Sequence, residues 1–338
     1  MNDKFELVKY MKREIDGKTL YRIRALRPFN DVKKGDLGGW VESENNLRYD
    51  YLGENAWIYD NAAVYGKAIV LGNAHIYNDA RICAELYQNN ASISGNAKIH
   101  GQAKIDAGYD GVVSIGGNAQ IFGNAKITSG KISENAKVYD NAEITGGSIS
   151  ENAKIFGNAK ILSGSIRGNA QIYGNSKIEL GRNNISQAGV IMGNAKIFDN
   201  AQIDGLVSIF DNAKIYGNTK AYNNSNLDNY IKIYGHAEIY GDAKLEFNAE
   251  ISERIHISGN ANIGKINDYF SLYAIGPEDE PLTAFKQSDQ SIMISHGDLN
   301  VTVDIFEYLI KERHKEGKYR DVYLSLIETI KKQLSKLK

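Results

Sequence analysis

The sequence predicts a mainly β protein in which short strands coil into a three-sided parallel stack. An aliphatic residue recurs every five or six positions from about residue 50 to residue 264, and Gly-Asn or Asp-Asn pairs separate many of these positions. An α-helix would repeat near 3.6 residues, so this spacing excludes one there. The 338-residue chain also contains 33 glycines, which is typical of turn-rich β structure. Internal repeats of this kind predict units that are buried only by stacking on one another.

The repeat closes every 17 residues in the middle of the chain, where the steps are six, six and five, and every 18 residues farther on. Each unit reads small, polar, aliphatic, and alternation along a strand sends the first and third side chains inward. We therefore expect Ala136 and Val138 to face a core and Lys137 to face water. The Gly-Asn and Asp-Asn pairs are expected to turn the corners, because these residues tolerate positive φ.

The two ends of the chain lack this repeat, so we expect three parts: an N-terminal β-hairpin cap (residues 1–50), a coil (51–264) and a C-terminal α+β module (265–338). Asp16-Gly17 is a strong hairpin signal between two predicted strands. Because the end of a stacked coil needs a cover, we expect Trp40 to plug the first one.

The C-terminal module is predicted to contain strands followed by two helices. Three short strands are expected in DYFSLYAIG, PLTAFKQSD and SIMISHGDL, and the helices in TVDIFEYLIKERHKEG and KYRDVYLSLIETIKKQL. Asp304 is the expected N-cap of the first helix. The second helix is expected to bury one face, formed by Val322, Leu326, Ile330 and Leu334.

The six-residue period resembles that of hexapeptide-repeat proteins, which form a left-handed parallel β-helix, and the resemblance covers about residues 50–264. It implies that the coil is left-handed. The layout is also similar to a group of bacteriophage and prophage proteins. These carry a KKGDLGGWVE stretch (here Lys33 to Glu42), an Asn-Ala-rich β-helix and an LTAF segment (here Leu282 to Phe285) before C-terminal helices. This second resemblance implies a phage or prophage origin and names no reaction.

Charge and cysteine content narrow the class of protein. With 40 Lys and Arg against 41 Asp and Glu, general binding to polyanions is disfavoured, and we expect no nucleic-acid partner. The single cysteine, Cys83, cannot form an internal disulfide, which favours a reducing compartment. No signal peptide and no apolar run of membrane-spanning length is seen. The predicted location is therefore the cytoplasm of the bacterial host, away from membranes.

Two chemistries known for hexapeptide-repeat proteins can be tested against the sequence. Acyltransferases of this class use a histidine as base beside acyl-CoA, and the γ-class carbonic anhydrases use three convergent zinc ligands. The histidines on the coil fall on outward or corner positions, and their spacings of 20 and 25 residues do not match the repeat. We therefore expect no catalytic residue, no metal and no cofactor. The histidines are His75, His100, His236, His256, His296 and His314.

Two sets of residues are candidates for binding. The outward position after each inward aliphatic residue is often aromatic, and rings at equivalent positions of successive coils should stack. The alternative for this set is that the rings only stabilise the walls. The set contains Phe122, Tyr139, Phe156 and Tyr173 with Phe210 continuing the count, and Phe198, Tyr216 and Tyr234 on the next wall.

The second set lies where the repeat is interrupted, because insertions in repeat proteins often map to a binding face. The alternative is neutral drift in a tolerant corner. The candidate contacts are Tyr87, Tyr109, Asp110 and Arg182.

These observations favour a non-enzymatic binding protein of phage origin that engages a bacterial host protein and inhibits host antiviral defence. The protein partner could also be another phage component, and a homo-oligomer is expected. Two alternatives remain open: an acyltransferase that uses acyl-CoA, and a protein that sequesters a small signalling nucleotide between subunits.

Overall fold

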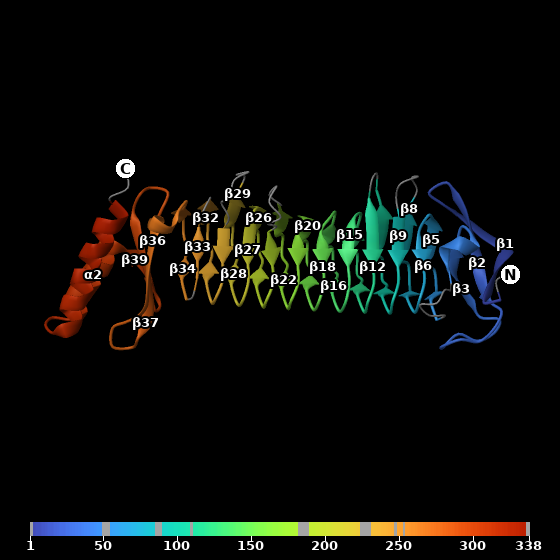
Figure 1. The fold of residues 1–338 in the computed structure, drawn as a ribbon, viewed down its shortest axis with the longest axis horizontal. Coiled ribbons are helices and arrows are strands. Elements are labelled where there is room, and N and C mark those ends of the chain that lie inside the picture. Colours follow the sequence, from blue (N-terminus) through green and yellow to red (C-terminus); the bar gives the residue numbers. More distant parts are fainter. Residues whose placement is uncertain are drawn as a thin grey trace. The chain divides into compact units, whose positions relative to one another are not determined.

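The computed structural model describes residues 3–48, 55–84, 90–108, 111–181, 189–223, 231–246, 249–252 and 254–335. The chain divides into two compact units, residues 1–175 and 176–338. Both are mainly β and contain parallel sheets of short strands, as the repeat predicts (Figure 1). Neither described helix is long and apolar enough to cross a bilayer.

In unit 1 the chain visits three sheets in rotation, so each coil strand pairs with the strand one coil away. This topology is consistent with a parallel β-helix. The first sheet contains β1 (Phe5–Ile15), β2 (Lys18–Ala25), β3 (Leu37–Val41), β5 (Ala63–Gly66), β8 (Arg81–Ala84), β11 (Lys104–Ala107), β14 (Lys126–Ile127), β17 (Glu143–Ile144) and β20 (Lys160–Ser163). The second contains β4 (Trp57–Ile58), β7 (His75–Ile76), β10 (Lys98–Ile99), β13 (Gln120–Ile121), β16 (Lys137–Val138), β19 (Lys154–Ile155) and β22 (Gln171–Ile172). The third contains β6 (Ile69–Val70), β9 (Asn90–Ile93), β12 (Val112–Ile115), β15 (Gly130–Ile132), β18 (Ser148–Ile149) and β21 (Ser165–Ile166).

The core of unit 1 consists of equivalent aliphatic residues stacked from coil to coil. Val138 pairs with Ile121 on one side and with Ile155 on the other. Val138 and Ala136 are completely buried, whereas Lys137 between them is half-buried. The predicted alternation is therefore confirmed, and the alanines are small where the backbone turns toward the next sheet.

The corners are held by glycine, by acidic residues at positive φ, and by ladders of asparagine amides. Gly123 has a φ of +69°, and a Cβ there would lie 2.9 Å from the backbone nitrogen of Asp140, so a side chain would be crowded as well as strained. In one ladder Nδ2 of Asn118 donates to Oδ1 of Asn135 over 3.0 Å, and Nδ2 of Asn135 donates to Oδ1 of Asn152 over 3.2 Å. Each corner thus bonds to the next through side chains as well as backbone.

The N-terminal hairpin is present, with β1 antiparallel to β2 and both turn residues, Asp16 and Gly17, at positive φ. The expectation that Trp40 plugs the first coil is wrong. Val41 faces the core, so Trp40, its neighbour on the strand, points to the outer face. Trp57 also lies on an outer face, because it pairs with His75 and precedes the inward Ile58, but the rings of Phe5 and Phe29 in the cap cover it and leave 1% of its surface exposed.

Unit 2 begins with three parallel sheets and continues into an antiparallel sheet and two helices. The first parallel sheet contains β23 (Lys177–Leu180), β26 (Gln202–Gly205), β29 (Lys220–Asn223), β32 (Lys244–Glu246) and β35 (Asn262–Ile263). The second contains β25 (Lys196–Ile197), β28 (Lys214–Ile215), β31 (Glu238–Ile239) and β34 (His256–Ile257). The third contains β24 (Val190–Ile191), β27 (Val207–Ile209), β30 (Ile231–Ile233) and β33 (Glu250–Ile251). The antiparallel sheet is β36 (Tyr269–Ile275), β37 (Glu280–Lys286), β38 (Ile292–His296) and β39 (Leu299–Thr302), followed by α1 (Val303–Arg313) and α2 (Lys318–Ser335).

The antiparallel sheet contacts the last coil of unit 2 on one side and the helices on the other (Figure 1). Oγ1 of Thr283 accepts from the backbone N–H of His256 over 3.3 Å, and the backbone N–H of Ser288 donates to the carbonyl of Asn260 over 2.9 Å. These hydrogen bonds connect the module to the last coil of this unit.

Two local predictions for the helices need correction. Thr302, not Asp304, is the N-cap of α1, because the Thr302 side chain accepts from a backbone N–H of the first turn. In α2 the predicted stripe repeated strictly every four residues and therefore drifts around a helix with 3.6 residues per turn. Val322 is exposed and Leu326 only half-buried. The buried face alternates steps of four and three through Tyr323, Ile327, Ile330 and Leu334.

We predict that Asn135→Asp lowers the free energy of unfolding by about 1 kcal/mol, since a carboxylate cannot donate to Asn152 and one corner hydrogen bond is lost. Urea unfolding followed by circular dichroism measures the change. Asn90→Asp is the matched control, because the exposed Asn90 side chain makes no hydrogen bond to another described residue. Equal midpoints for the two variants would show that the amide ladder contributes nothing.

Candidate functional site

A continuous stack of aromatic rings runs along the second sheet of unit 1, with one ring per coil. Each ring follows the buried aliphatic residue of its strand. Neighbouring ring centroids lie 4.7 to 4.9 Å apart, and their planes differ by 1° to 9°. The stack consists of His100, Phe122, Tyr139, Phe156 and Tyr173. Four of these rings were predicted to stack, and whether they bind anything stays a prediction.

The sequence analysis missed three rings of this sheet that obey the same rule. His100 belongs to the stack, and Tyr59 and Tyr77 form a separate stacked pair 4.6 Å apart. Each follows an inward isoleucine, so the repeat itself could have found them. All of these rings are half-buried, because neighbouring rings cover their faces. The surface therefore presents ring edges rather than ring faces.

The ring stacks of unit 2 are arranged differently from the prediction. Phe198 stacks on Tyr216, and Tyr216 stacks on Tyr240. Phe210 was predicted to continue the count that starts at Phe122, but it follows β27 of the third sheet, so that prediction is wrong. Tyr234 stacks on Phe210 rather than continuing the row of Tyr216. Tyr234 was misplaced because equivalent positions are 18 residues apart between Asn200 and Asn218 but 24 apart between Lys214 and Glu238. The six extra residues shift every later position to the next sheet.

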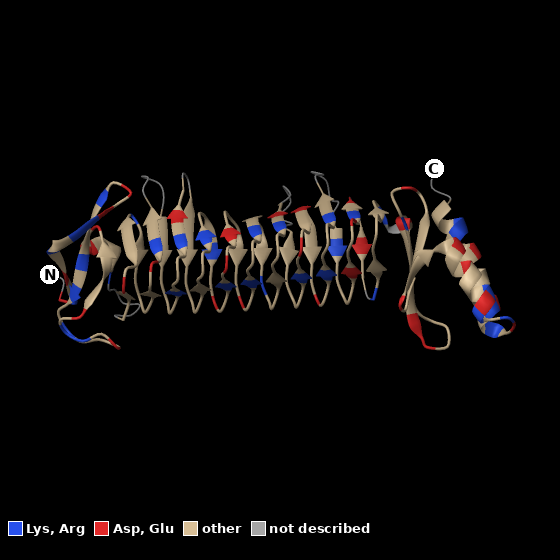
Figure 2. Cartoon of the chain, turned by 180° about the vertical axis from the view of Figure 1, so that it is seen from behind, with Lys and Arg blue, Asp and Glu red and all other residues tan. Residues whose placement is uncertain are grey.

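A row of basic side chains crosses the outer face of the first sheet of unit 1. Arg22 lies opposite Trp40, Trp40 opposite Ala63, Ala63 opposite Arg81, and Arg81 opposite Lys104. Neighbouring strands are about 4.8 Å apart, and residues in register share one face. Lys and Arg residues recur on successive strands of this unit (Figure 2). The row therefore places an aromatic ring among several cations.

Two guanidinium groups stack on the indole of Trp40. The Cζ atoms of Arg13 and Arg22 lie 4.9 and 5.1 Å from the ring centroid. Among the described residues, no carboxylate forms an ion pair with Arg13, Arg22 or Arg81. Burial lowers the pKa of Arg13, and the nearby charges of Arg81 and Arg22 lower it further. Asp79, a nearby carboxylate, raises the pKa of Arg13 and so offsets these effects only in part. Positive charge is thus concentrated around Trp40.

The basic row and the ring stack meet at one edge of unit 1. Phe122 precedes the corner Gly123-Asn124, and Lys126 follows it on β14. Asn124 begins an amide ladder along that corner. We call these three rows together the corner surface. It comprises the ring stack from His100 to Tyr173, the ladder Asn124, Asn141, Asn158 and Asn175, and the basic row Arg13, Arg22, Trp40, Arg81, Lys104 and Lys126.

The histidines and the cysteine of unit 1 have structural contacts. Nε2 of His75 lies 3.2 Å from the carbonyl of Asn55, so it carries the proton, and Nδ1 accepts from the Tyr77 hydroxyl over 2.7 Å. Burial lowers the pKa of His75 and of His100. Cys83 follows the inward Ile82 and lies on the outer face, but the N-terminal hairpin covers it, and burial raises its pKa to about 12. A thiol in that state is a poor nucleophile at neutral pH.

The four candidates at repeat interruptions cannot be assigned a structural role. Tyr87, Tyr109, Asp110 and Arg182 all lie outside the described residues. Their proposed contacts stay predictions. Among the residues that are described, no group of three or more His, Cys, Asp or Glu side chains is arranged to hold a metal ion.

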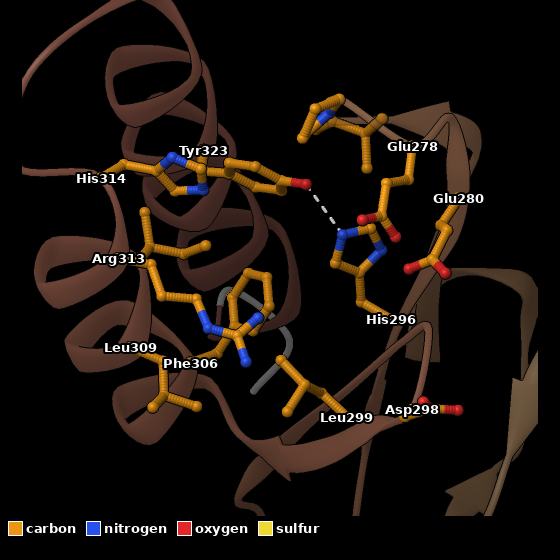
Figure 3. A pocket seen from close by; sticks show the side chains of 13 residues that line it. Glu278, Glu280, His296, Asp298, Leu299, Phe306, Leu309, Arg313, His314 and Tyr323 are labelled. Carbon is orange, nitrogen blue, oxygen red and sulfur yellow. Dashed lines mark hydrogen bonds between the residues drawn. The ribbon is translucent and has the colours of Figure 1, made fainter.

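The C-terminal module contains a pocket that the sequence analysis did not predict. It has a volume of about 340 Å³ and lies between two turns of the antiparallel sheet and the facing ends of α1 and α2 (Figure 3). Carboxylates come from the sheet side and basic groups from the helix side. The lining residues are Ile275, Pro277, Glu278, Glu280, His296, Asp298, Leu299, Phe306, Leu309, Ile310, Arg313, His314 and Tyr323.

A hydrogen-bonded pair forms one wall of this pocket. Nδ1 of His296 lies 3.1 Å from the carbonyl of Pro281, so it carries the proton in the neutral ring. Nε2 then accepts from the hydroxyl of the buried Tyr323 over 2.8 Å. Burial, followed by the charges of Glu280 and Glu278, raises the pKa of Tyr323, which keeps the phenol protonated. The pair is therefore a fixed polar wall rather than an activated nucleophile.

Comparison with known proteins does not identify the chain. No family model matches it, and no curated protein matches its sequence significantly. Its function must therefore be argued from the corner surface and the pocket.

We predict that stability falls more steeply in acid for the wild type than for His100→Phe. The pKa of His100 is lower in the folded state than its ordinary value of 6.5, so below about pH 6.5 the unfolded state binds more protons than the folded state. Proton binding then favours unfolding, and the free energy of unfolding decreases as the pH falls. Phe preserves the ring stack and removes the proton site. Thermal unfolding at pH 7.5 and pH 5 measures both proteins. Identical losses for the two would contradict the assignment.

Proposed function

We propose that this protein is a non-enzymatic binding protein whose corner surface engages an acidic patch on a partner protein. The observation that carries the proposal is the cluster of Arg13, Arg22 and Arg81 around Trp40. Like charges held close together are unfavourable, and an acidic partner would relieve the repulsion that remains between the three guanidinium groups. Arginine and tryptophan are also the residues that most often dominate binding energy at protein interfaces.

The form of the surface supports the same conclusion. Strand pairing and the amide ladder hold its side chains in rows, so few side chains would need to be ordered on binding. The ring edges of Tyr139 and Phe156 add apolar area beside the charges. The buried Cys83 thiol and the bonded His75 ring do not support the acyltransferase alternative, which needs a base free to reach substrate.

The partner and the setting rest on the resemblances noted in the sequence. The stretch from Lys33 to Glu42 and the segment from Leu282 to Phe285 are similar to those of phage and prophage proteins. We therefore propose a bacterial host protein as partner, met in the host cytoplasm, and inhibition of antiviral defence as the outcome. We also propose that the coil is a left-handed hexapeptide-repeat β-helix and that the chain forms a homo-oligomer. An experimental structure and native mass spectrometry would test these two points.

The binding proposal is tested by capturing partners from a bacterial lysate with tagged protein. We expect one host protein to bind stoichiometrically, and a variant combining Arg22→Glu with Arg81→Glu to bind it at least tenfold more weakly, because charge reversal repels an acidic patch. Tyr139→Asp should weaken binding at the neighbouring rings.

Lys220→Glu is the matched control, since Lys220 is exposed at the equivalent strand position in unit 2. Melting temperatures of all variants should be compared so that unfolding is not mistaken for lost binding. The proposal fails if the folded double variant retains the same partner with the same affinity.

A further inference from the structure

We propose that the pocket of the C-terminal module binds a basic amino acid as a free small molecule. This site is separate from the corner surface and has a different ligand class. The ligand would place its ammonium and its side-chain cation against the carboxylates of Glu278 and Glu280, and its carboxylate against Arg313.

The charges that line the pocket are separated rather than paired. Glu278 and Asp298 come from turns of the antiparallel sheet, Glu280 is the first residue of β37, and Arg313 is the last residue of α1 (Figure 3). In the described part of the chain none of these four side chains forms an ion pair or a side-chain hydrogen bond. Opposite charges thus face one cavity without neutralising each other, which leaves both free for a dipolar ligand.

The numbers of acidic and basic side chains in the pocket indicate which kind of amino acid it would bind. Two carboxylates, those of Glu278 and Glu280, point toward the cavity opposite the guanidinium of Arg313, whereas the Asp298 carboxylate at the rim points away (Figure 3). A neutral amino acid would satisfy Arg313 with its carboxylate and one acidic group with its ammonium. A second cationic group on the ligand would be needed to offset the remaining negative charge. Arginine and lysine have this combination of one carboxylate and two cations.

Aromatic rings from both the sheet and the helices line the pocket. The rings of Phe306, Tyr323 and His296 contact one another with centroids 5.6 to 5.9 Å apart, and His314 stacks on Tyr323 at 6.0 Å. Ring faces attract ammonium and guanidinium groups. Since the His296–Tyr323 hydrogen bond holds two of these rings, the wall is already ordered before a ligand arrives.

The size of the pocket agrees with this class of ligand. A volume of about 340 Å³ is at the lower end of the range for small-molecule sites, and it is too small to enclose acyl-CoA. The carboxylates would also repel the phosphates of a nucleotide. The pocket therefore disfavours both alternative ligands considered from the sequence and favours a compact cation-rich molecule.

The test is isothermal titration calorimetry of the full-length protein with three related probes. L-arginine carries all three charges, agmatine lacks the carboxylate, and L-citrulline lacks the side-chain charge. We expect L-arginine to bind saturably, and agmatine and L-citrulline each to bind at least tenfold more weakly. Equal affinity for agmatine would overturn the role of Arg313, equal affinity for L-citrulline would overturn the role of the carboxylates, and no saturable binding of L-arginine would overturn the site.

Two substitutions assign the binding to this pocket. Glu280→Gln and Arg313→Met should each weaken L-arginine binding at least tenfold while leaving the melting temperature within the range of the controls. The controls are Glu312→Gln and Lys315→Met, which remove the same charges from exposed positions outside the lining. Unchanged affinity in both pocket variants would show that L-arginine binds elsewhere and would refute the proposal.

Discussion

Each coil of this protein can bury its inward side chains only against the same positions of the next coil. Val138 illustrates this, because it is fully buried between Ile121 and Ile155 and pairs with both. Register is therefore strict: a slip by one residue would turn Lys137 inward and expose the aliphatic row. The alanines and the positive-φ corner residues follow from the same requirement, since each turn must fit closely beneath the next.

Strict register also determines the outer surface. Because equivalent positions lie one above another, any residue type that recurs outward becomes a row, as the ring stack and the asparagine ladder show. Rings and amides stabilise such rows by contacting their own kind. Like charges repel one another instead. Contacts between equivalent positions of successive coils therefore do not account for the basic row around Trp40. It is the part of the described surface that an external partner would stabilise most directly.

The ends of the coils need covers, and these depart from the repeat. In unit 1 the hairpin brings rings of the cap against Trp57. In unit 2 the antiparallel sheet contacts the last coil, and the helices cover the sheet's other face. In the coils, each side chain points either into the packed core or outward to the surface.

In the C-terminal module, side chains from turns, strands and helices can instead point into one cavity. Glu280, Arg313 and Tyr323 line one pocket for this reason.

The sequence by itself determined the parallel sheets, the inward and outward positions and the stacking of Phe122 with Tyr139, because a period shared by every coil encodes them locally. It also placed the hairpin at Asp16-Gly17. Only the tertiary structure decided which rings bury Trp57, which row Tyr234 joins, and which residues meet in the pocket. The burial of Trp57 depends on cap segments that carry no repeat, and the row depends on the length of one coil. The pocket depends on helix packing, which brings together residues with no common spacing in the chain.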